Sequence, residues 1–314
     1  MHLFLGLDGG QSSTTAMIGD SSGRVLGIGR GGPCNHVSGA EARARFTTVI
    51  ATCVAKAQAA LPESNPAFHA ACFGFSGGPA DKQTIIREMF EIEHLTVTHD
   101  ALIALSGATS GRPGIITIAG TGSIAFGRNA SGTTARAGGW GYIFGDEGGG
   151  FDLTRQALRA ALRMEEGWGP PTALRESLLA ATGASDANDL LHRFYTQEFP
   201  RPAIAGFSRR VDEAAIEGDQ AAHDILSGAA RQLAILAGAV RQQLFRENES
   251  VYVAYTGGAF QSDLLRERFR MLIELTAGNH CGPPEMGPAA GALLEAYRLA
   301  HLSVSLSNVP EVEK

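Results

Sequence analysis

The chain has 314 residues, enough for about two domains, and its 44% hydrophobic content can fill two packed cores. The formal net charge is −6 and there is no run of basic residues, so nucleic acid and anionic membrane surfaces are not expected as partners. We expect small molecules to be bound instead. No apolar stretch reaches the roughly 18 residues of a membrane span, and an apolar strand begins at once without a basic leader. The expected location is cytoplasmic.

The first half of the chain has a βββαβαβα pattern. Short β-type runs alternate with turns, of which Asp20-Ser21-Ser22-Gly23 is the clearest hairpin signal. Apolar residues that recur at intervals of three and four predict the first long helix. The expected elements are strands 3–7, 14–18, 24–28, 68–75 and 94–97 and helices 41–61, 81–90 and 101–106.

The pattern then restarts after Gly111-Arg112-Pro113-Gly114, which predicts a hinge or linker. A three-strand meander opened by a glycine turn occurs a second time, about 110 residues after the first, which indicates duplicated domains. Helical patterns dominate the rest. The expected elements are strands 115–119, 124–128, 133–137 and 251–255 and helices 151–164, 173–181, 186–197, 204–217, 220–247, 262–273 and 288–300.

Three short glycine turns, each at the end of an apolar run, are the most informative feature of the chain. They are Asp8-Gly9-Gly10-Gln11-Ser12-Ser13-Thr14, Gly120-Thr121-Gly122-Ser123 and Thr256-Gly257-Gly258-Ala259-Phe260. Glycine permits a positive φ and close approach by a ligand, and successive backbone N–H groups in a turn form a concave anion site. The turns therefore predict a nucleotide-binding protein.

The lysine positions exclude the commonest nucleotide-binding loop. A Walker loop requires Gly-x-x-x-x-Gly-Lys, whereas the only lysines are Lys56, Lys82 and Lys314, and none follows such a glycine. Phosphate charge must then be met by backbone dipoles and by a divalent cation, which needs a carboxylate such as Asp8 nearby.

These turns and one further block carry a family resemblance. The order Asp8-Gly9-Gly10, Gly120-Thr121-Gly122-Ser123, Gly138-Gly139-Trp140-Gly141 to Gly145-Asp146-Glu147-Gly148, and Thr256-Gly257-Gly258 resembles that of the N-acetylglucosamine kinase family. That family is grouped with the BadF-type ATPases in the actin-like and sugar-kinase superfamily. The resemblance runs from residue 3 to about residue 300.

The resemblance implies an α/β protein of two actin-like (ribonuclease H-like) domains with a cleft between them. The N-terminal domain would span 1–112 and be completed by the C-terminal helix 288–303. The second domain, 113–287, would carry a helical insertion. It further implies ATP and Mg²⁺ as cofactors and a homodimeric assembly.

The resemblance also implies roles for particular residues. Asp100 matches the catalytic base, and Asp8 would orient Mg²⁺ through water. The implied nucleotide-binding residues are Gly9, Gly10, Gln11, Ser12, Ser13, Thr14, Gly120, Thr121, Gly122, Ser123, Gly257, Gly258 and Ala259. The implied sugar-binding residues are Asn35, Ser76, Asp100, Thr121, Gly139, Trp140, Gly141 and Asp146.

Two departures from the family pattern leave the sugar preference open. His99 stands where the family commonly has Asn before the catalytic Asp, and Gln11-Ser12-Ser13-Thr14 departs from the usual first turn. The expected substrate is the 6-hydroxyl of N-acetylglucosamine, with glucosamine and N-acetylmuramic acid as alternatives.

Simpler roles remain open for several of these residues. Asp100 follows a strand and precedes a helix, so it is also a good helix N-cap. Asp8 could simply begin the turn at Gly9-Gly10. Trp140 could be a core aromatic residue, and Asn35 could cap a turn after Gly31-Gly32-Pro33.

Two short motifs offer competing interpretations. Gly74-Phe75-Ser76-Gly77-Gly78 matches the G-x-S-x-G of a hydrolase nucleophile elbow, but leaves the other glycine turns unexplained. Gly27-Ile28-Gly29-Arg30-Gly31-Gly32 fits a dinucleotide motif, but Pro33 follows where a helix should begin.

A competing class is an ATP-driven activator protein that passes electrons through an iron–sulfur cluster. Its clusters lie between paired cysteines. Here the cysteines are scattered, at Cys34, Cys53, Cys72 and Cys281, and none lies in a C-x-x-C pair. Reduced, structural thiols are therefore expected.

Overall fold

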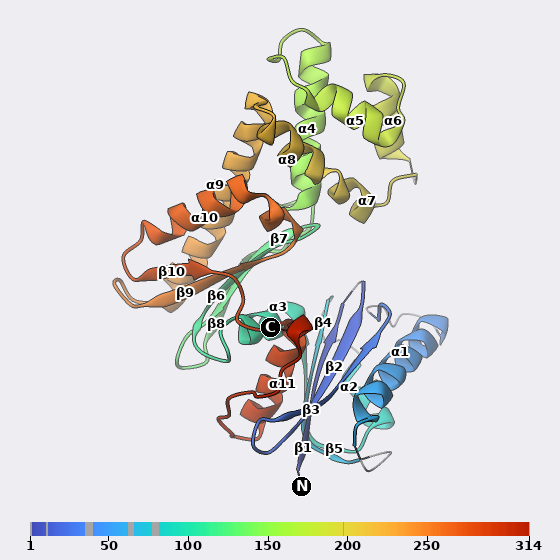
Figure 1. The fold of residues 1–314 in the computed structure, drawn as a ribbon, viewed down its shortest axis with the longest axis vertical. Helices are drawn as coiled ribbons and strands as arrows, with labels where there is room; N and C mark the ends of the chain where they lie inside the picture. The colour runs from blue at the N-terminus through green and yellow to red at the C-terminus, as the bar shows by residue number, and fades with distance from the viewer. Residues whose placement is uncertain are drawn as a thin grey trace. The chain divides into compact units, whose positions relative to one another are not determined.

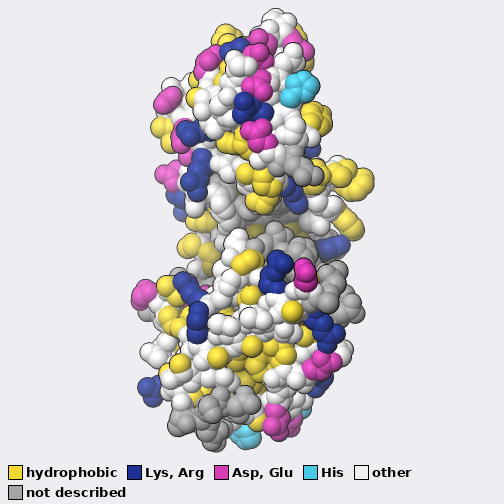
Figure 2. Space-filling view, turned by 90° about the vertical axis from the view of Figure 1, so that its right-hand side faces the viewer, with side chains coloured by type: hydrophobic (Ala, Val, Ile, Leu, Met, Phe, Trp, Pro, Cys, Tyr) yellow, Lys and Arg dark blue, Asp and Glu magenta, His cyan; other side chains and the backbone are white. Residues whose placement is uncertain are grey.

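A computed structural model describes residues 2–10, 12–34, 40–61, 66–76, 82–196 and 198–313. Its contacts divide the chain into two compact units. Unit 1 comprises Met1–Pro113 and Pro283–Lys314, and unit 2 comprises Gly114–Gly282. None of the described helices combines the length and hydropathy that a bilayer span requires. Figure 2 shows Lys and Arg side chains interspersed with Asp and Glu over the face that it presents.

Unit 1 is a five-stranded mixed sheet with helices on both faces (Figure 1). The strand order is β3-β2-β1-β4-β5, in which β1–β3 form an antiparallel meander and β4 and β5 run parallel to β1. The elements are β1 (Leu3–Gly9), β2 (Thr14–Asp20), β3 (Val25–Gly31), α1 (Ala40–Gln58), β4 (Phe68–Phe75), α2 (Lys82–Met89), β5 (Ile92–His99), α3 (Asp100–Ala108), α11 (Pro288–Leu299) and the 3₁₀ turn η2 (Glu311–Glu313).

Two apolar layers hold unit 1 together, one on each face of the sheet. Phe46 and Ile50 of α1 pack with Phe73 and Phe75 of β4 on one face. On the other face α11 packs against β1 and α3, and the ring of its Tyr297 lies 4.3 Å from that of Phe4. The C-terminal helix is thus part of the N-terminal unit.

Unit 2 repeats this sheet. Its order, β10-β9-β6-β7-β8, again joins an antiparallel meander (β6–β8) to two parallel strands (β9 and β10). The same topology in both units agrees with the repeat found in the sequence. The elements are β6 (Gly114–Ala119), β7 (Ser123–Arg128), β8 (Thr134–Gly138), α4 (Gly150–Glu165), α5 (Leu174–Thr182), α6 (Ala187–Tyr195), α7 (Arg201–Gly206), α8 (Ser208–Ile216), α9 (Gln220–Leu244), β9 (Val251–Thr256), η1 (Gly258–Gln261), α10 (Asp263–Glu274) and β10 (Asn279–Gly282).

Two expectations about elements of unit 2 were wrong. The single helix expected over 204–217 is two helices, broken at Phe207. The Phe207 N–H donates to the Ile204 carbonyl instead of continuing the i→i−4 ladder, and its ring packs against those of Phe194 and Phe199. Strand β10 was also missed, because its sequence Asn-His-Cys-Gly has no apolar run.

The dinucleotide motif lies inside a strand. Gly27–Gly31 belongs to β3, so no helix opens there and the dinucleotide interpretation is wrong. Its glycines serve packing instead. A Cβ on Gly29 would lie 1.9 Å from the Cys53 carbonyl oxygen, so glycine lets α1 pack closely on this strand.

The contacts also place the return to unit 1 earlier than the expected boundary at 287/288. Glu285 and Met286 donate backbone hydrogen bonds of 3.2 and 3.1 Å to Ala108 and Gly107 at the end of α3. Unit 1 therefore resumes directly after β10.

Candidate functional site

Three predicted polar side chains lie at one edge of the unit 1 sheet. Asp8 is next to last in β1, Ser76 follows β4 directly, and Asp100 follows β5 directly. The three strands are parallel, so their carboxyl ends lie together, where α/β sheets generally bind ligands. Ser76 Oγ donates a hydrogen bond of 2.8 Å to Asp100 Oδ2, and Ser76 N donates one of 3.4 Å to the Gly9 carbonyl.

Asp100 is not the N-cap of α3. His99 is the N-cap, and its Nδ1 accepts a hydrogen bond of 3.3 Å from Leu102 N. Asp100 is the first helical residue, and its Oδ1 accepts one of 2.9 Å from Ala101 N. The N-cap alternative for Asp100 is therefore wrong. His99, which stands where the family commonly has Asn, thus serves as the N-cap of this helix.

Asp8 is a half-buried carboxyl group in a negatively charged setting. Burial, together with the carboxylates of Glu313 and Asp100, raises the pKa of Asp8 to about 7. Glu313 is itself buried, and burial raises its pKa as well. A divalent cation would relieve this concentration of negative charge, so the residues present fit Mg²⁺. Glu313 lies after the last expected helix and was not predicted from the sequence.

The first glycine turn is closed by a hydrogen bond of 2.9 Å from Gly10 N to the Ser13 carbonyl. Ser12 and Ser13 are exposed, whereas Thr14 is fully buried. The Thr14 hydroxyl lies 2.7 Å from the Gly32 carbonyl oxygen and 2.9 Å from Cys34 Sγ, so its polar atom is engaged within unit 1. Gln11 and Asn35 lie outside the described residues.

In unit 2, the second glycine turn joins β6 to β7 and lies against the start of α4. The carbonyls of Gly120 and Thr121 accept hydrogen bonds from Gly150 N (2.8 Å) and Phe151 N (3.1 Å). The first N–H groups of α4 are therefore satisfied by the turn. These two hydrogen bonds hold the turn against the start of α4.

Asp146 anchors the glycine-rich block beneath the same turn. It is 5% exposed, has φ +67°, accepts a hydrogen bond of 3.3 Å from Ser123 N and forms an ion pair with Arg201. A Cβ on Gly122 would lie 2.3 Å from Asp146 Oδ2, so only glycine leaves room for this carboxylate. Arg201 was missed, because it lies outside every motif.

Gly139 and Trp140 of this block are exposed, and Gly141 is partly exposed. Trp140 is 66% exposed, so the alternative that it is a core residue is wrong. The Arg136 guanidinium lies 4.7 Å above its ring, a cation–π arrangement. Gly139 and Gly141 both have positive φ, which fixes a turn on either side of the indole.

The third glycine turn opens a cavity of about 360 Å³ within unit 2. Two of the three predicted residues, Gly258 and Ala259, line it. Gly257 has φ +109° and precedes η1, which carries these two residues. The other lining residues come from α4, α8, α9 and the segment 261–262, and they were not anticipated from the sequence: Leu153, Ser208, Arg209, Asp212, Glu213, Leu226, Gln261 and Ser262. The volume falls within the range of small-ligand pockets.

The four cysteines are free thiols in or beside the cores. Cys34, Cys53 and Cys72 are buried, and Cys281 packs against the core of unit 2. Burial raises the pKa of Cys53 to about 11 and that of Cys281 to about 12. These thiols are unreactive at neutral pH, as structural cysteines are.

A model of the BadF/BadG/BcrA/BcrD ATPase family matches residues 5–296, nearly the whole chain. The chain belongs to this ATPase family. Membership in the BadF/BadG/BcrA/BcrD group confirms the resemblance found in the sequence.

Relatives in this family extend the comparison. The chain is 34% identical over 281 residues to an N-acetylmuramic acid/N-acetylglucosamine kinase of Clostridium acetobutylicum, covering 88% of this chain and 91% of that protein. It is 30% identical over 289 residues to the N-acetyl-D-glucosamine kinase of Dictyostelium discoideum, covering 85% and 90%. A crystal structure of a candidate N-acetylglucosamine kinase from Chromobacterium violaceum aligns with TM-score 0.74 and 25% identity, over 94% of this chain and 98% of that one. These matches confirm the α/β class.

Proposed function

We propose that this protein is a kinase that transfers the γ-phosphoryl group of ATP to a hydroxyl of an amino sugar. The observation that carries the proposal is the position of Asp100, hydrogen-bonded by Ser76 at the same sheet edge as Asp8. A sugar hydroxyl is a poor nucleophile at neutral pH. A carboxylate that accepts its proton as the bond to phosphorus forms contributes about 10²–10⁴-fold to the rate.

Asp8 is the residue we assign to Mg²⁺, through water. Mg²⁺ would neutralise charge on the phosphate oxygens during transfer. Asp8 lies at the end of β1, next to the first glycine turn, where it would orient the Mg²⁺ ion. Gly9, Gly10, Gln11, Ser12, Ser13 and Thr14 are proposed for the β- and γ-phosphates. The buried Thr14 contributes by holding the turn to β3, through its contact with Gly32.

Unit 2 supplies the remaining nucleotide contacts in this proposal. Gly120, Thr121, Gly122 and Ser123 form the second phosphate turn. The cavity lined by Gly258 and Ala259 holds the nucleoside, and Gly257 makes the turn that precedes these two residues. The acidic side chains of Asp212 and Glu213 in its wall can accept hydrogen bonds from hydroxyl and amino groups, which supports a nucleoside as occupant.

For the sugar we propose contacts from Asn35, Ser76, Asp100, Thr121, Gly139, Trp140, Gly141 and Asp146. The names of the Clostridium and Dictyostelium relatives support N-acetylglucosamine as the first substrate to test, with N-acetylmuramic acid as an alternative. Glucosamine is the third candidate. Transfer to the 6-hydroxyl, a homodimeric assembly and a cytoplasmic location remain predictions from the sequence.

A coupled ADP-release assay with Mg²⁺ and ATP tests the proposal. The acceptors are N-acetylglucosamine, N-acetylmuramic acid, glucosamine, N-acetylmannosamine, glucose and water alone. Turnover with one amino sugar well above the water blank supports the kinase and names its substrate, and ³¹P–¹H correlation of the product to the C6 methylene protons tests the 6-hydroxyl. ATP hydrolysis that no sugar alters would contradict the proposal and favour an ATPase that serves a protein partner.

A further inference from the structure

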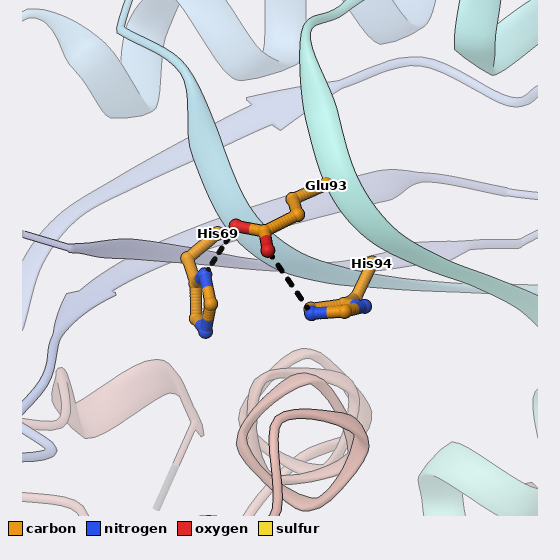
Figure 3. A group of neighbouring side chains, drawn as sticks. All are labelled: His69, Glu93 and His94. Carbon is orange, nitrogen blue, oxygen red and sulfur yellow. Dashed lines mark hydrogen bonds and ion pairs between the residues drawn. The ribbon is translucent and has the colours of Figure 1, made fainter.

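A second group of polar side chains lies on the unit 1 sheet, at the end opposite Asp8 and Asp100. His69 is the second residue of β4, and Glu93 and His94 are the second and third residues of β5. Figure 3 shows the two imidazoles side by side with the Glu93 carboxylate between them. The proposed catalytic residues have no contact with this cluster, because Ser76 lies seven residues along β4, about 23 Å at 3.3 Å per residue.

The three side chains already point their donor atoms at one another. His69 Nδ1 lies 2.7 Å from Glu93 Oε2, and His94 Nε2 lies 3.4 Å from Glu93 Oε1. One ligand atom of each residue lies within 4.8 Å of the other two. Around a tetrahedral ion with bonds of about 2.0–2.1 Å, neighbouring ligand atoms are about 3.4 Å apart. Small rotations of these side chains would therefore bring all three onto one ion.

We propose that His69, Glu93 and His94 bind one divalent transition-metal ion, and that this ion is Zn²⁺. Two imidazole nitrogens and one carboxylate oxygen match zinc, whereas Mg²⁺ prefers an all-oxygen shell. This site is therefore separate from the magnesium site assigned to Asp8, both in position and in the chemistry of its ligands.

The surroundings favour an ion in this position. The side chains of His94 and Glu93 are 46% and 63% exposed, so an ion and its remaining water ligands can reach them, while the side chain of His69 is 25% exposed. The His2 ring lies 4.7 Å from the His69 ring, which brings a third imidazole to the rim of the cluster.

The role that follows is structural. β5 is the edge strand of the sheet, and its start is joined to β4 here by side chains as well as by backbone pairing. An ion bound by residues of both strands would stabilise this edge, because it binds the folded state and not the separated strands.

Zinc titration of the full-length, untagged protein tests this proposal, after treatment with a chelator and removal of the chelator. Isothermal titration with ZnCl₂ at pH 7.5 is expected to show one equivalent bound. One equivalent of Zn²⁺ is also expected to raise Tm, and an excess of MgCl₂ is expected neither to compete nor to raise Tm through this site. His94→Gln is expected to weaken zinc binding by at least about tenfold, since even indirect partners of metal ligands contribute that much.

Two variants serve as controls. His280→Gln removes an exposed strand histidine of unit 2 and is expected to bind zinc as the wild type does. Asp8→Asn is also expected to keep the zinc equivalent. Because His94 is half exposed, its glutamine variant is expected to fold, which far-UV circular dichroism without metal verifies. Less than half an equivalent bound by the wild type, or equal affinity in the His94→Gln and His280→Gln variants, would overturn the proposal.

Discussion

Ser76 Oγ and Asp100 Oδ2 are joined by a hydrogen bond of 2.8 Å that links the ends of two neighbouring parallel strands. The other carboxylate oxygen, Oδ1, accepts the Ala101 N–H at 2.9 Å. Each oxygen of a carboxylate has two lone pairs, so beside these two hydrogen bonds each oxygen has a second lone pair that can accept a proton from a substrate hydroxyl. The carboxylate is thus held in a fixed orientation without being saturated, which is what a general base requires.

Replacing Asp100 by Asn is expected to abolish phosphoryl transfer while ATP still binds. The amide has the size of the carboxylate but cannot accept the proton, so a loss of about 10²–10⁴-fold in kcat is expected. The coupled assay measures the rate, and isothermal titration measures ATP affinity. Asp263→Asn, an exposed aspartate in the first turn of α10, is the matched control and should have wild-type activity. Substantial kcat in Asp100→Asn would remove Asp100 from the catalytic role.

Ser76→Ala is expected to lower kcat by about tenfold. Hydrogen bonds to charged groups contribute about 1.5–3 kcal/mol, but solvent can replace part of this one. The residue acts by positioning the base, so Ser76→Thr, which keeps a hydroxyl, should recover most of the lost rate. Steady-state kinetics at saturating sugar measure the effect. A threonine variant as slow as the alanine variant would argue against the hydrogen bond as the cause.

Gly122→Ala is expected to destabilise unit 2. The new Cβ would lie 2.3 Å from Asp146 Oδ2, so the carboxylate would have to leave its bond to Ser123 N and its ion pair with Arg201. Overpacking of this kind costs about 1–3 kcal/mol. Both tryptophans, Trp140 and Trp168, belong to unit 2, so their fluorescence during urea unfolding reports on this unit.

The matched control for that variant is Gly238→Ala on α9. A Cβ there meets nothing within 4 Å, and alanine is favoured over glycine in a helix by about 1 kcal/mol. The control should therefore be at least as stable as the wild type. Equal stability of the two variants would mean that Asp146 can move freely.

Gly258→Val is expected to raise KM for ATP about tenfold with little change in kcat. A Cβ on Gly258 meets open space, so the branched side chain can enter the 360 Å³ cavity without disturbing its walls. Partial filling weakens binding of the nucleoside in the ground and transition states alike, which raises KM selectively. Ser227→Val fills a different hollow, between α9 and α10, and should leave KM unchanged. An unchanged KM in Gly258→Val would place the nucleoside elsewhere.

The sequence was sufficient for features that depend on local patterns. Asp8, Ser76 and Asp100 each end an apolar run, and parallel strands bring such positions to one edge whatever the intervening length. The glycine turns were visible for the same reason. The three-strand meander that occurs twice in the sequence predicted the sheet topology that the two units share.

Other features depend on tertiary packing and leave no local signal. Arg201 pairs with Asp146 across 55 residues, and no spacing in the sequence points to that pair. Glu313 comes near Asp8 because α11 returns to unit 1, bringing the C-terminal segment with it. The contribution of α8 to the cavity wall could not be predicted either, because Ser208 and Asp212 look like ordinary exposed helix residues in the sequence.

Asp219 is expected to make the stability of unit 2 depend on pH in the acid range. It is the N-cap of α9, and it accepts hydrogen bonds from Ala222 N (2.9 Å), Thr172 Oγ1 (2.8 Å) and Ala173 N (2.6 Å). Burial tends to raise its pKa, but these hydrogen bonds outweigh burial, so the pKa of Asp219 is lowered in the folded state. The carboxylate therefore stabilises the fold fully above the unfolded value of about 3.9, and this contribution is lost as pH falls through the lowered folded pKa.

Asp219→Ala should accordingly lower the free energy of unfolding by about 0.5–2 kcal/mol at pH 7, the usual range for an N-cap, and by progressively less as pH falls below about 4. Urea unfolding at pH 7 and pH 3, followed by tryptophan fluorescence, measures both values. Asp224→Ala on the same helix is the control, because Asp224 is exposed and its side chain bonds only to Gln220 among the hydrogen bonds described. The hydrogen bonds of Asp219 join the start of α9 to the segment before α5. A loss in the free energy of unfolding that stayed the same at both pH values would assign the contribution of Asp219 to packing rather than to its charged carboxylate.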